Sequence, residues 1–202
     1  MKKIAIGITG GIGSGKSTVS NIILENGHHV LISDEIAKKI MNDDAGIASK
    51  ISDNFGTECY KDGKLNTKYL AEKVFNSPDR MRRLNAIVHP PTIDLIKKEI
   101  QIVLTNKDLV FVESALIFEA KMEDLFDYIL LVTAEENLRI KRVLKRDLET
   151  ISEIKSRILN QIPEEQKRGR AHFVIENNST IDELNSKVNF FLKIFRSLPD
   201  IS

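Results

Sequence analysis

The sequence predicts an α/β fold with a central parallel sheet, because short buried strands alternate with helices from the first residues on. Residues 4–8 form a nearly continuous apolar run that ends in a glycine cluster, as expected for a central strand covered on both faces. Helical spacing of apolar residues follows over 16–25, where Asn26-Gly27 supplies a stop signal. A second strand and helix follow at 29–32 and 34–41, and this alternation is typical of parallel α/β sheets.

The middle of the chain differs, because residues 46–105 contain no strongly apolar strand. A turn at Lys61-Asp62-Gly63-Lys64 separates helical patterns, and so do the prolines after His89, since X-Pro sequences commonly end helices. The helices expected in this part cover residues 47–55, 67–75, 78–88 and 92–104. We therefore expect a helical insertion in the sheet.

Strands resume after the insertion and complete the sheet. The expected strands cover 109–113, 128–132 and 172–175, and a last helix covers 181–195. A charged helical segment at about 137–170, called the lid segment below, lies between the last two strands. The predicted organisation is a core of residues 1–45 and 106–202, which includes the lid segment, and a helical insertion of residues 46–105.

Composition excludes several classes of protein. The chain has 202 residues, 42% hydrophobic and 29% charged, which are ordinary globular values. A net charge of +1 does not favour nucleic acid as a partner, and the longest apolar runs are far below the ~18 residues of a membrane span. Cys59 is the only cysteine, so no internal disulfide forms. We expect a cytoplasmic protein, a monomer or small homo-oligomer, that acts on small molecules.

The glycine cluster after the first strand matches a phosphate-binding motif. Gly10-Gly11-Ile12-Gly13-Ser14-Gly15-Lys16-Ser17 fits G-x-x-x-x-G-K-[ST], the P-loop, between a strand and a helix. Glycines let successive N–H groups point at phosphate oxygens, and the following helix adds its partial positive charge. Lys16 is expected to reach the β- and γ-phosphates, and Ser17 to join the Mg²⁺ shell. The residues expected to bind the nucleotide are Gly11, Gly13, Ser14, Gly15, Lys16, Ser17 and Thr18.

Two short segments imitate GTPase motifs, but their surroundings argue against a GTP switch. Asp53-Asn54-Phe55-Gly56 spells D-x-x-G at the end of a helical pattern rather than after a strand. Asn106-Lys107-Asp108 resembles N-K-x-D, but Leu109 stands where the base-reading carboxylate would be. The sequence therefore favours a kinase for a small molecule over a nucleotide-dependent switch or binding module.

A kinase needs a group that orients or deprotonates the acceptor hydroxyl, and two carboxylates stand at strand ends. Asp34 follows the second strand, and the carboxyl ends of parallel strands face one ligand crevice. Asp34 is equally suited to cap the following helix, and the two roles are compatible. Glu113 at the end of a later strand is a candidate for holding a Mg²⁺-bound water; the alternative is a solvent-facing strand end.

The lid segment carries a positive face. Arg139, Arg142 and Arg146 are spaced to share one side of a helix, and residues 137–170 hold ten Lys plus Arg against five Asp plus Glu. Most charge runs are solvated faces, but arginine forks also suit phosphate oxygens.

Several segments together resemble the dephospho-coenzyme A kinase family. The similarity begins with residues 8–19 around the P-loop and continues, in the family's order, over nearly the whole chain. The further segments are Asp34-Glu35-Ile36-Ala37, Leu84-Asn85-Ala86-Ile87-Val88-His89-Pro90, Ser114-Ala115-Leu116-Ile117-Phe118-Glu119, Arg142-x-x-x-Arg146-Asp147 and Val174-Ile175-Glu176-Asn177. Two positions depart from the family pattern, Ile32 in place of a frequent Asp and Ser114 in place of a usual Pro.

The resemblance implies a three-layer fold of the P-loop NTPase type with a helical substrate-binding insertion and a lid. It implies ATP-dependent phosphorylation of the 3′-hydroxyl of dephospho-CoA, the last step of coenzyme A synthesis, with Mg²⁺. Carried over, Asp34 is the base, Lys16 and Ser17 serve the phosphates and Mg²⁺, Arg142 and Arg146 belong to the lid, and Asn177 joins the nucleotide-binding set. A P-loop kinase for another acceptor, such as a nucleoside monophosphate, is the alternative.

Two further residues are candidates for substrate contact. His89 either touches the substrate or caps a helix boundary before Pro90-Pro91. Phe118 is expected in the wall of the substrate pocket or in the core rather than in the chemistry.

Overall fold

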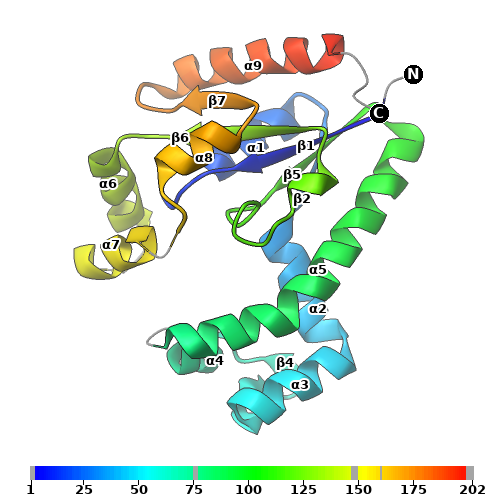
Figure 1. Cartoon of the computed structure of the whole chain (residues 1–202), viewed down its shortest axis with the longest axis vertical. Helices are drawn as coiled ribbons and strands as arrows, with labels where there is room; N and C mark the ends of the chain where they lie inside the picture. Colours follow the sequence, from blue (N-terminus) through cyan, green and yellow to red (C-terminus); the bar gives the residue numbers. More distant parts are fainter. Residues whose placement is uncertain (1–2, 75–76, 147–149, 160, 199–202) are drawn as a thin grey trace. The chain divides into compact units, whose positions relative to one another are not determined.

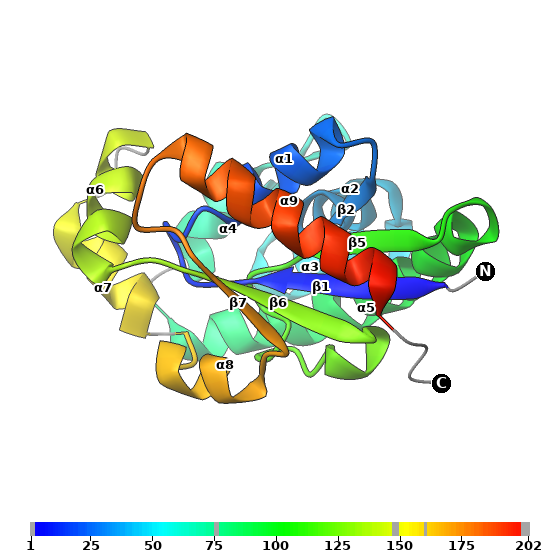
Figure 2. The same cartoon turned by 90° about the horizontal axis from the view of Figure 1, so that it is seen from above.

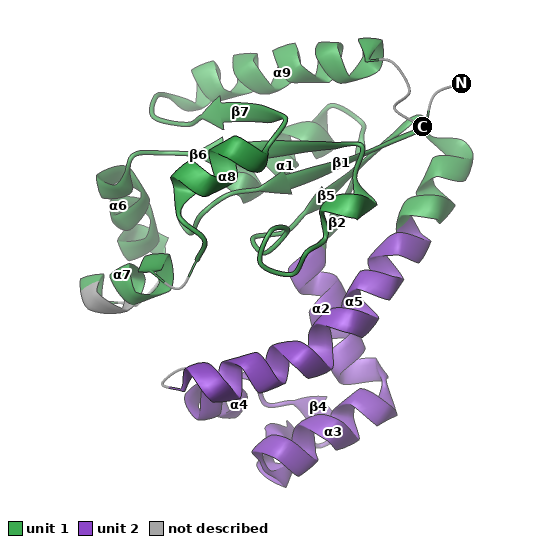
Figure 3. Cartoon of the chain, viewed as in Figure 1, with its two compact units in different colours: residues 1–32, 100–202 green, residues 33–99 purple. Residues whose placement is uncertain are grey.

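The computed structural model describes residues 3–74, 77–146, 150–159 and 161–198. Phe75, at the end of a predicted helix, and Asp147, at the end of the predicted lid motif, lie outside the described residues. The chain forms two compact units, residues 1–32 with 100–202 and residues 33–99 (Figure 3). Within the described ranges, no helix is both long and apolar enough to cross a membrane.

A parallel sheet forms the centre of the first unit. Its five described strands have the order β2-β5-β1-β6-β7, so β1 lies between two strands that follow it much later in the chain. The strands are β1 (Ile4–Thr9), β2 (His29–Ile32), β5 (Leu109–Glu113), β6 (Tyr128–Thr133) and β7 (Phe173–Glu176). All pair in parallel, and the predicted strands are confirmed to within one residue at each end. Because apolar side chains cover both faces, β1, β5 and β6 are buried throughout.

Helices α1 (Lys16–Glu25) and α9 (Ile181–Ser197) cover one face of this sheet (Figures 1 and 2). Their buried side chains, such as Ile23 and Phe195, pack on Ile6 and Leu130 of the strands. On the other face, Gly7 lets Ile117 and Phe126 approach β1 so closely that a Cβ there would collide with them. The short 3₁₀ helix η2 (Glu123–Leu125) belongs to this segment after β5.

The described residues of the lid segment form three helices. They are α6 (Glu136–Arg146), α7 (Ile151–Leu159) and α8 (Glu164–Arg170). Ile12 of the P-loop packs in one small cluster with Ile140, Val143 and Ile154 of α6 and α7. The lid segment is therefore in apolar contact with the loop.

The second unit is helical, with a small hairpin. It contains α2 (Ser33–Asp43), α3 (Ala45–Phe55), η1 (Thr57–Cys59), β3 (Tyr60–Lys61), β4 (Lys64–Leu65), α4 (Thr67–Val74) and most of α5 (Pro78–Asn106). The turn predicted at residues 61–64 is confirmed: Asp62 and Gly63 both have positive φ, 51° and 74°, as in a type I′ hairpin turn. The two-residue strands on either side were not predicted.

The predicted helix boundary at His89 is wrong, because α5 runs unbroken through Pro90 and Pro91. Pro90 and Pro91 have no backbone N–H, so the carbonyls of Ala86 and Ile87 lack the helical N–H donors of those positions. Thr92 Oγ1 donates to Val88 O at 2.8 Å, and both Val88 and Thr92 are buried. Packing on both sides of the prolines thus outweighs the local preference for a break.

The compact units and the predicted domains divide the chain at different residues. The units separate at 32/33 and 99/100, whereas the sequence predicts boundaries at 45/46 and 105/106. The difference arises at the first boundary because α2 packs with α3 through Ile40 and Ile47. The function of the insertion stays a prediction.

Candidate active site

The P-loop connects β1 to α1 at the carboxyl edge of the sheet. Its backbone turns through positive φ at Gly13 (74°) and Gly15 (96°), a region that residues with a Cβ rarely adopt. Gly15 precedes the first residue of α1, so the N-terminus of the helix faces the loop. This combination of glycine turns and a helix start is a ready-made anion site.

A cavity of about 320 Å³ opens beside the loop and is lined by half of the predicted site residues. It is lined by Gly13, Gly15, Lys16, Ser17, Thr18, Arg142, Val143 and Arg146. Lys16 Nζ donates to Gly11 O at 3.3 Å, which folds its side chain over the loop. Three cationic side chains thus meet where phosphates of a nucleotide would lie, and we call this cavity the phosphate pocket.

Glu113 lies beside the loop rather than in solvent. It pairs with Ile8 of β1 and Ile32 of β2, and only 8% of its surface is exposed. Ser17 Oγ donates to Glu113 Oε1 at 3.1 Å. A hydroxyl and a carboxylate at this distance are the oxygen ligands that Mg²⁺ takes in P-loop proteins. Within the described ranges, no group of three or more His, Cys, Asp or Glu could hold a metal. A Mg²⁺ ion bound together with phosphates needs only one or two protein ligands, so this finding is compatible with the Ser17–Glu113 pair.

Arg142 connects the lid segment to the end of β7. Its Nη2 donates to Asn177 O at 2.9 Å, while its Nη1 is buried with no hydrogen-bond partner in the described part of the chain. A buried guanidinium N–H that lacks an acceptor, beside a pocket that suits anions, is a donor available for a ligand.

Asn177 contacts the loop itself. Its Nδ2 donates to Ser14 O at 2.9 Å, and its backbone N–H donates to Thr133 O. Ser14 is fully buried, and its N–H donates to Gly11 O. Asn177 therefore supports the loop through Ser14 O, and neither Ser14 nor Asn177 lines the phosphate pocket.

Arg139 is buried, although it was expected on one face with Arg142 and Arg146. Only 6% of its surface is exposed; its Nε donates to Ile12 O at 2.9 Å and its Nη1 to Glu164 Oε2 at 3.3 Å. The interpretation as a solvated face is therefore wrong for Arg139. Gln161, which the sequence did not single out, accepts from Ile12 N at 3.1 Å. No pattern in the sequence indicates that contact, because it joins a side chain to a backbone atom far along the chain.

Asp34 and His89 belong to the second unit. Asp34 is exposed in the first turn of α2, which begins at Ser33, so it follows the helix start and does not cap it. His89 is half-buried within α5, and burial lowers its pKa below 6.5. The roles of both residues remain predictions.

Phe118 is almost fully buried in the first unit, and the guanidinium of Arg170 lies 4.5 Å from the centre of its ring. This cation–π contact fits the interpretation as a wall or core residue. Its neighbour Glu119 pairs with the buried Lys167 at 2.8 Å and accepts from Ile162 N. The segment after β5 is thereby tied to the lid segment.

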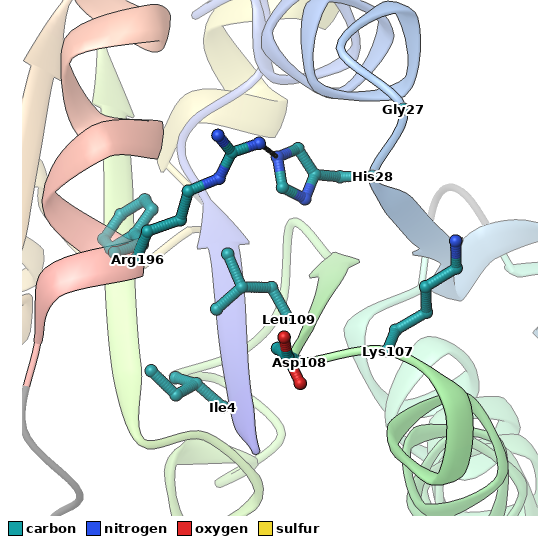
Figure 4. Close-up of a pocket in the computed structure, with 8 residues that line it drawn as sticks. Ile4, Gly27, His28, Lys107, Asp108, Leu109 and Arg196 are labelled. Atoms are coloured by element: carbon teal, nitrogen blue, oxygen red, sulfur yellow. Dashed lines mark hydrogen bonds between the residues drawn. The ribbon is translucent and has the colours of Figure 1, made fainter. Parts of the chain in front are cut away.

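A larger cavity, about 470 Å³, lies at the amino ends of β1 and β5 and contains none of the predicted site residues (Figure 4). His28 Nε2 lies 3.2 Å from Arg196 Nη2 there, with Ile4 and Leu109 nearby. Burial, and then the charges of Arg196 and Lys107, lower the pKa of His28. Because β1 ends in the P-loop at its other end, this cavity is separate from the phosphate pocket.

The sheet order, the P-loop and the cationic pocket define a nucleotide-binding enzyme of the P-loop kinase class. The family model for dephospho-CoA kinase matches residues 4–183. The chain therefore belongs to the dephospho-CoA kinase family.

Individual relatives agree with this assignment. The chain is 38% identical to the dephospho-CoA kinase of Salinibacter ruber over 90% of this chain and 92% of that one. It resembles the crystal structure of a Thermus thermophilus protein with a TM-score of 0.80 and 34% identity, covering 99% of this chain and 100% of the other. The dephospho-CoA kinase of Campylobacter jejuni gives a TM-score of 0.67 and 28% identity, covering 95% and 97%.

Proposed function

We propose that the protein transfers the γ-phosphoryl group of ATP to the 3′-hydroxyl of dephospho-CoA, giving coenzyme A and ADP as the last step of coenzyme A synthesis. The observation that carries this proposal is the phosphate pocket, where the P-loop, the Ser17–Glu113 pair and two lid arginines meet. Family membership supplies the acceptor. The reaction takes place in the cytoplasm, on a monomer or small homo-oligomer.

Ser17 and Glu113 are the residues that hold Mg²⁺ in this proposal. Their oxygens lie 3.1 Å apart, and the Glu113 side chain is buried. A Mg²⁺ ion held by these two oxygens would offset negative charge on the phosphate oxygens.

Lys16, Arg142 and Arg146 stabilise the charge that spreads over the phosphate oxygens during transfer. All three line the phosphate pocket, and Arg142 Nη1 is a buried donor with no hydrogen-bond partner among the described residues. Preorganised donors in a site poor in water lower the barrier most, because they need no reorganisation when charge develops.

Asp34 orients the acceptor hydroxyl and takes its proton. It follows Ile32, which pairs with Glu113, after one intervening residue. Transfer through a loose transition state releases the proton late, so aiming the hydroxyl matters as much as removing its proton.

The helical insertion at residues 46–105 binds the acceptor through His89, and Phe118, which follows β5 in the first unit, is the second contact residue. His89 serves as a neutral donor or acceptor near pH 7, because burial lowers its pKa. Phe118 forms a wall and takes no part in the chemistry.

The test is an ADP-release assay with ATP and Mg²⁺ against dephospho-CoA, AMP, CMP and water. We expect release that depends on dephospho-CoA, with coenzyme A formed in equal amount. Turnover of AMP or CMP without turnover of dephospho-CoA would instead indicate a P-loop kinase that phosphorylates nucleoside monophosphates. The Lys16→Ala variant is the control for a contaminating kinase.

A further inference from the structure

Two carbonyl groups of the P-loop are held by side chains that come from outside it. Arg139 Nε donates to Ile12 O, and Asn177 Nδ2 donates to Ser14 O, each at 2.9 Å. Both side chains belong to residues that are only 6% exposed. They come from α6 and from the end of β7, far from the loop in sequence.

A held carbonyl fixes the direction of the next N–H group. The carbonyl of one residue and the N–H of the next point to opposite sides of a trans peptide, and the described residues contain no cis peptide. Holding Ile12 O away from the pocket therefore aims the N–H of Gly13 toward the other side. Holding Ser14 O does the same for the N–H of Gly15.

Those two glycines are the ones that line the phosphate pocket, whereas Ile12 and Ser14 are buried. The fit is tight: a Cβ on Gly13 would lie 2.5 Å from the carbonyl oxygen of Arg139, and one on Gly15 would collide with Asn177 Nδ2. The loop therefore packs tightly against Arg139 and Asn177.

Other contacts tie this arrangement to the lid segment. Glu164 of α8 accepts from Arg139, Gln161 accepts from the N–H of Ile12, and Arg142 donates to Asn177 O. The Gly11–Ile12 peptide is held on both sides, because Gly11 O also accepts from Ser14 N and Lys16 Nζ. At the next peptide, Ile12–Gly13, the carbonyl accepts from Arg139 Nε.

We propose that Arg139 and Asn177 are positioning residues that aim the N–H groups of Gly13 and Gly15 at the nucleotide phosphates. Their attachment to the lid segment sets how tightly the loop binds phosphate. The inference rests on the nucleotide-binding part of the proposed function and not on the identity of the acceptor.

The experiment compares Arg139→Met with Arg139→Gln, two neutral side chains of similar shape of which only Gln has a donor. Calorimetry measures binding of ADP and of AMP with Mg²⁺, and ADP binding that Lys16→Ala abolishes is assigned to the P-loop. We expect Arg139→Met to weaken ADP binding by about three- to tenfold, the scale of one hydrogen bond, and Arg139→Gln to recover most of it. AMP binding changes little, because AMP lacks the β-phosphate that the loop cradles.

Lys141→Met is the matched control, because Lys141 is exposed on the same helix and its loss removes the same charge. Asn177→Leu removes the second donor at similar volume. If Arg139→Met does not fold, this variant tests the proposal at the N–H of Gly15. Equal weakening by Met and Gln would assign the effect to charge and overturn the proposal. Equal loss of ADP and AMP affinity would indicate a general structural role and overturn it as well. Binding of ADP in the expected order without phosphorylation of dephospho-CoA would support this inference and contradict the proposed function.

Discussion

The two units of the chain differ in what they bury. Among the described residues, buried polar side chains concentrate in the first unit, where Glu113, Arg139 and Asn177 surround the P-loop. The second unit has only Ser33 and Thr92 of this kind among its described residues. Its core is apolar, built from side chains such as Ile51 and Leu70.

The buried polar side chains of the first unit position the P-loop, whereas the buried side chains of the second unit serve packing. A buried polar group costs free energy unless it is hydrogen-bonded, so its presence indicates a requirement beyond stability. In the first unit those groups hold the backbone of the loop or lie beside the phosphate pocket. The second unit is expected to tolerate polar changes and to respond mainly to loss of apolar volume.

The largest expected effect is that of Lys16→Ala on catalysis. Its ammonium is half-buried over the loop, and removing a preorganised donor from such a site lowers kcat by about 10³-fold. Melting temperature changes little, because the side chain lines a cavity rather than a packed core. Steady-state kinetics and thermal melts measure both, with the exposed Lys50→Ala in α3 as control. A kcat near that of the parent would mean that the loop does not act on the transferred phosphate.

The next largest effect is on stability and concerns Ile51, which is fully buried in α3. Ile51→Ala removes apolar volume from the second unit and is expected to cost about 2–5 kcal/mol of unfolding free energy. ADP affinity of the folded variant stays near the parent value, because the phosphate pocket belongs to the first unit.

Ile23→Ala is the matched variant, because Ile23 is equally buried in α1 directly after the P-loop. We expect a similar loss of stability together with weaker ADP binding. Urea unfolding gives the stability and calorimetry the affinity. Equal ADP affinities in the two variants would contradict the separation of roles between the units.

Asp34→Asn is expected to lower kcat by ~10²-fold, the scale of a lost general base. Asn has a similar size but cannot accept the proton. Asp34 and Glu35 are both exposed in the first turn of α2, where a negative charge stabilises the helix end. Glu35→Gln therefore controls for the loss of that charge. Single-turnover transfer at saturating substrates is the decisive measurement, and equal rates for both variants would leave Asp34 as a helix-end charge only.

The sheet was predictable from the sequence because its strands are buried on both faces. Continuous apolar runs such as 128–132 need no periodicity to be recognised. The second unit was predicted less well. The hairpin strands at Tyr60–Lys61 and Lys64–Leu65 are too short to show alternation, and tertiary packing carries α5 through two prolines.

The site was predictable where chemistry depends on residue type at fixed spacing. The P-loop motif and the carboxylate at the end of β5 could be found this way, and the structure brings Ser17 and Glu113 together. The side chains that hold the loop could not be predicted, because a hydrogen bond to a backbone oxygen does not depend on which residue of the loop carries that oxygen. Arg139 was expected on one helical face with Arg142 and Arg146, either solvated or facing phosphate, and Gln161 carried no signal.

The smallest expected effect compares one half-buried histidine from each unit, His28 and His89. Burial lowers the pKa of both below 6.5, and Arg196 and Lys107 add to the effect at His28 alone. The folded state therefore binds fewer protons than the unfolded state once the pH falls below about 6.5, so stability is lost on acidification. His28→Gln and His89→Gln should each flatten the dependence of unfolding free energy on pH between 7.5 and 5.5. The exposed His29→Gln is the control, measured by urea unfolding at each pH.

Because charges act on His28 in addition to burial, its variant should flatten the curve more at low salt than at high salt, whereas the His89 variant should be insensitive to salt. A salt-dependent His89 variant would show that unrecognised charges act in the second unit.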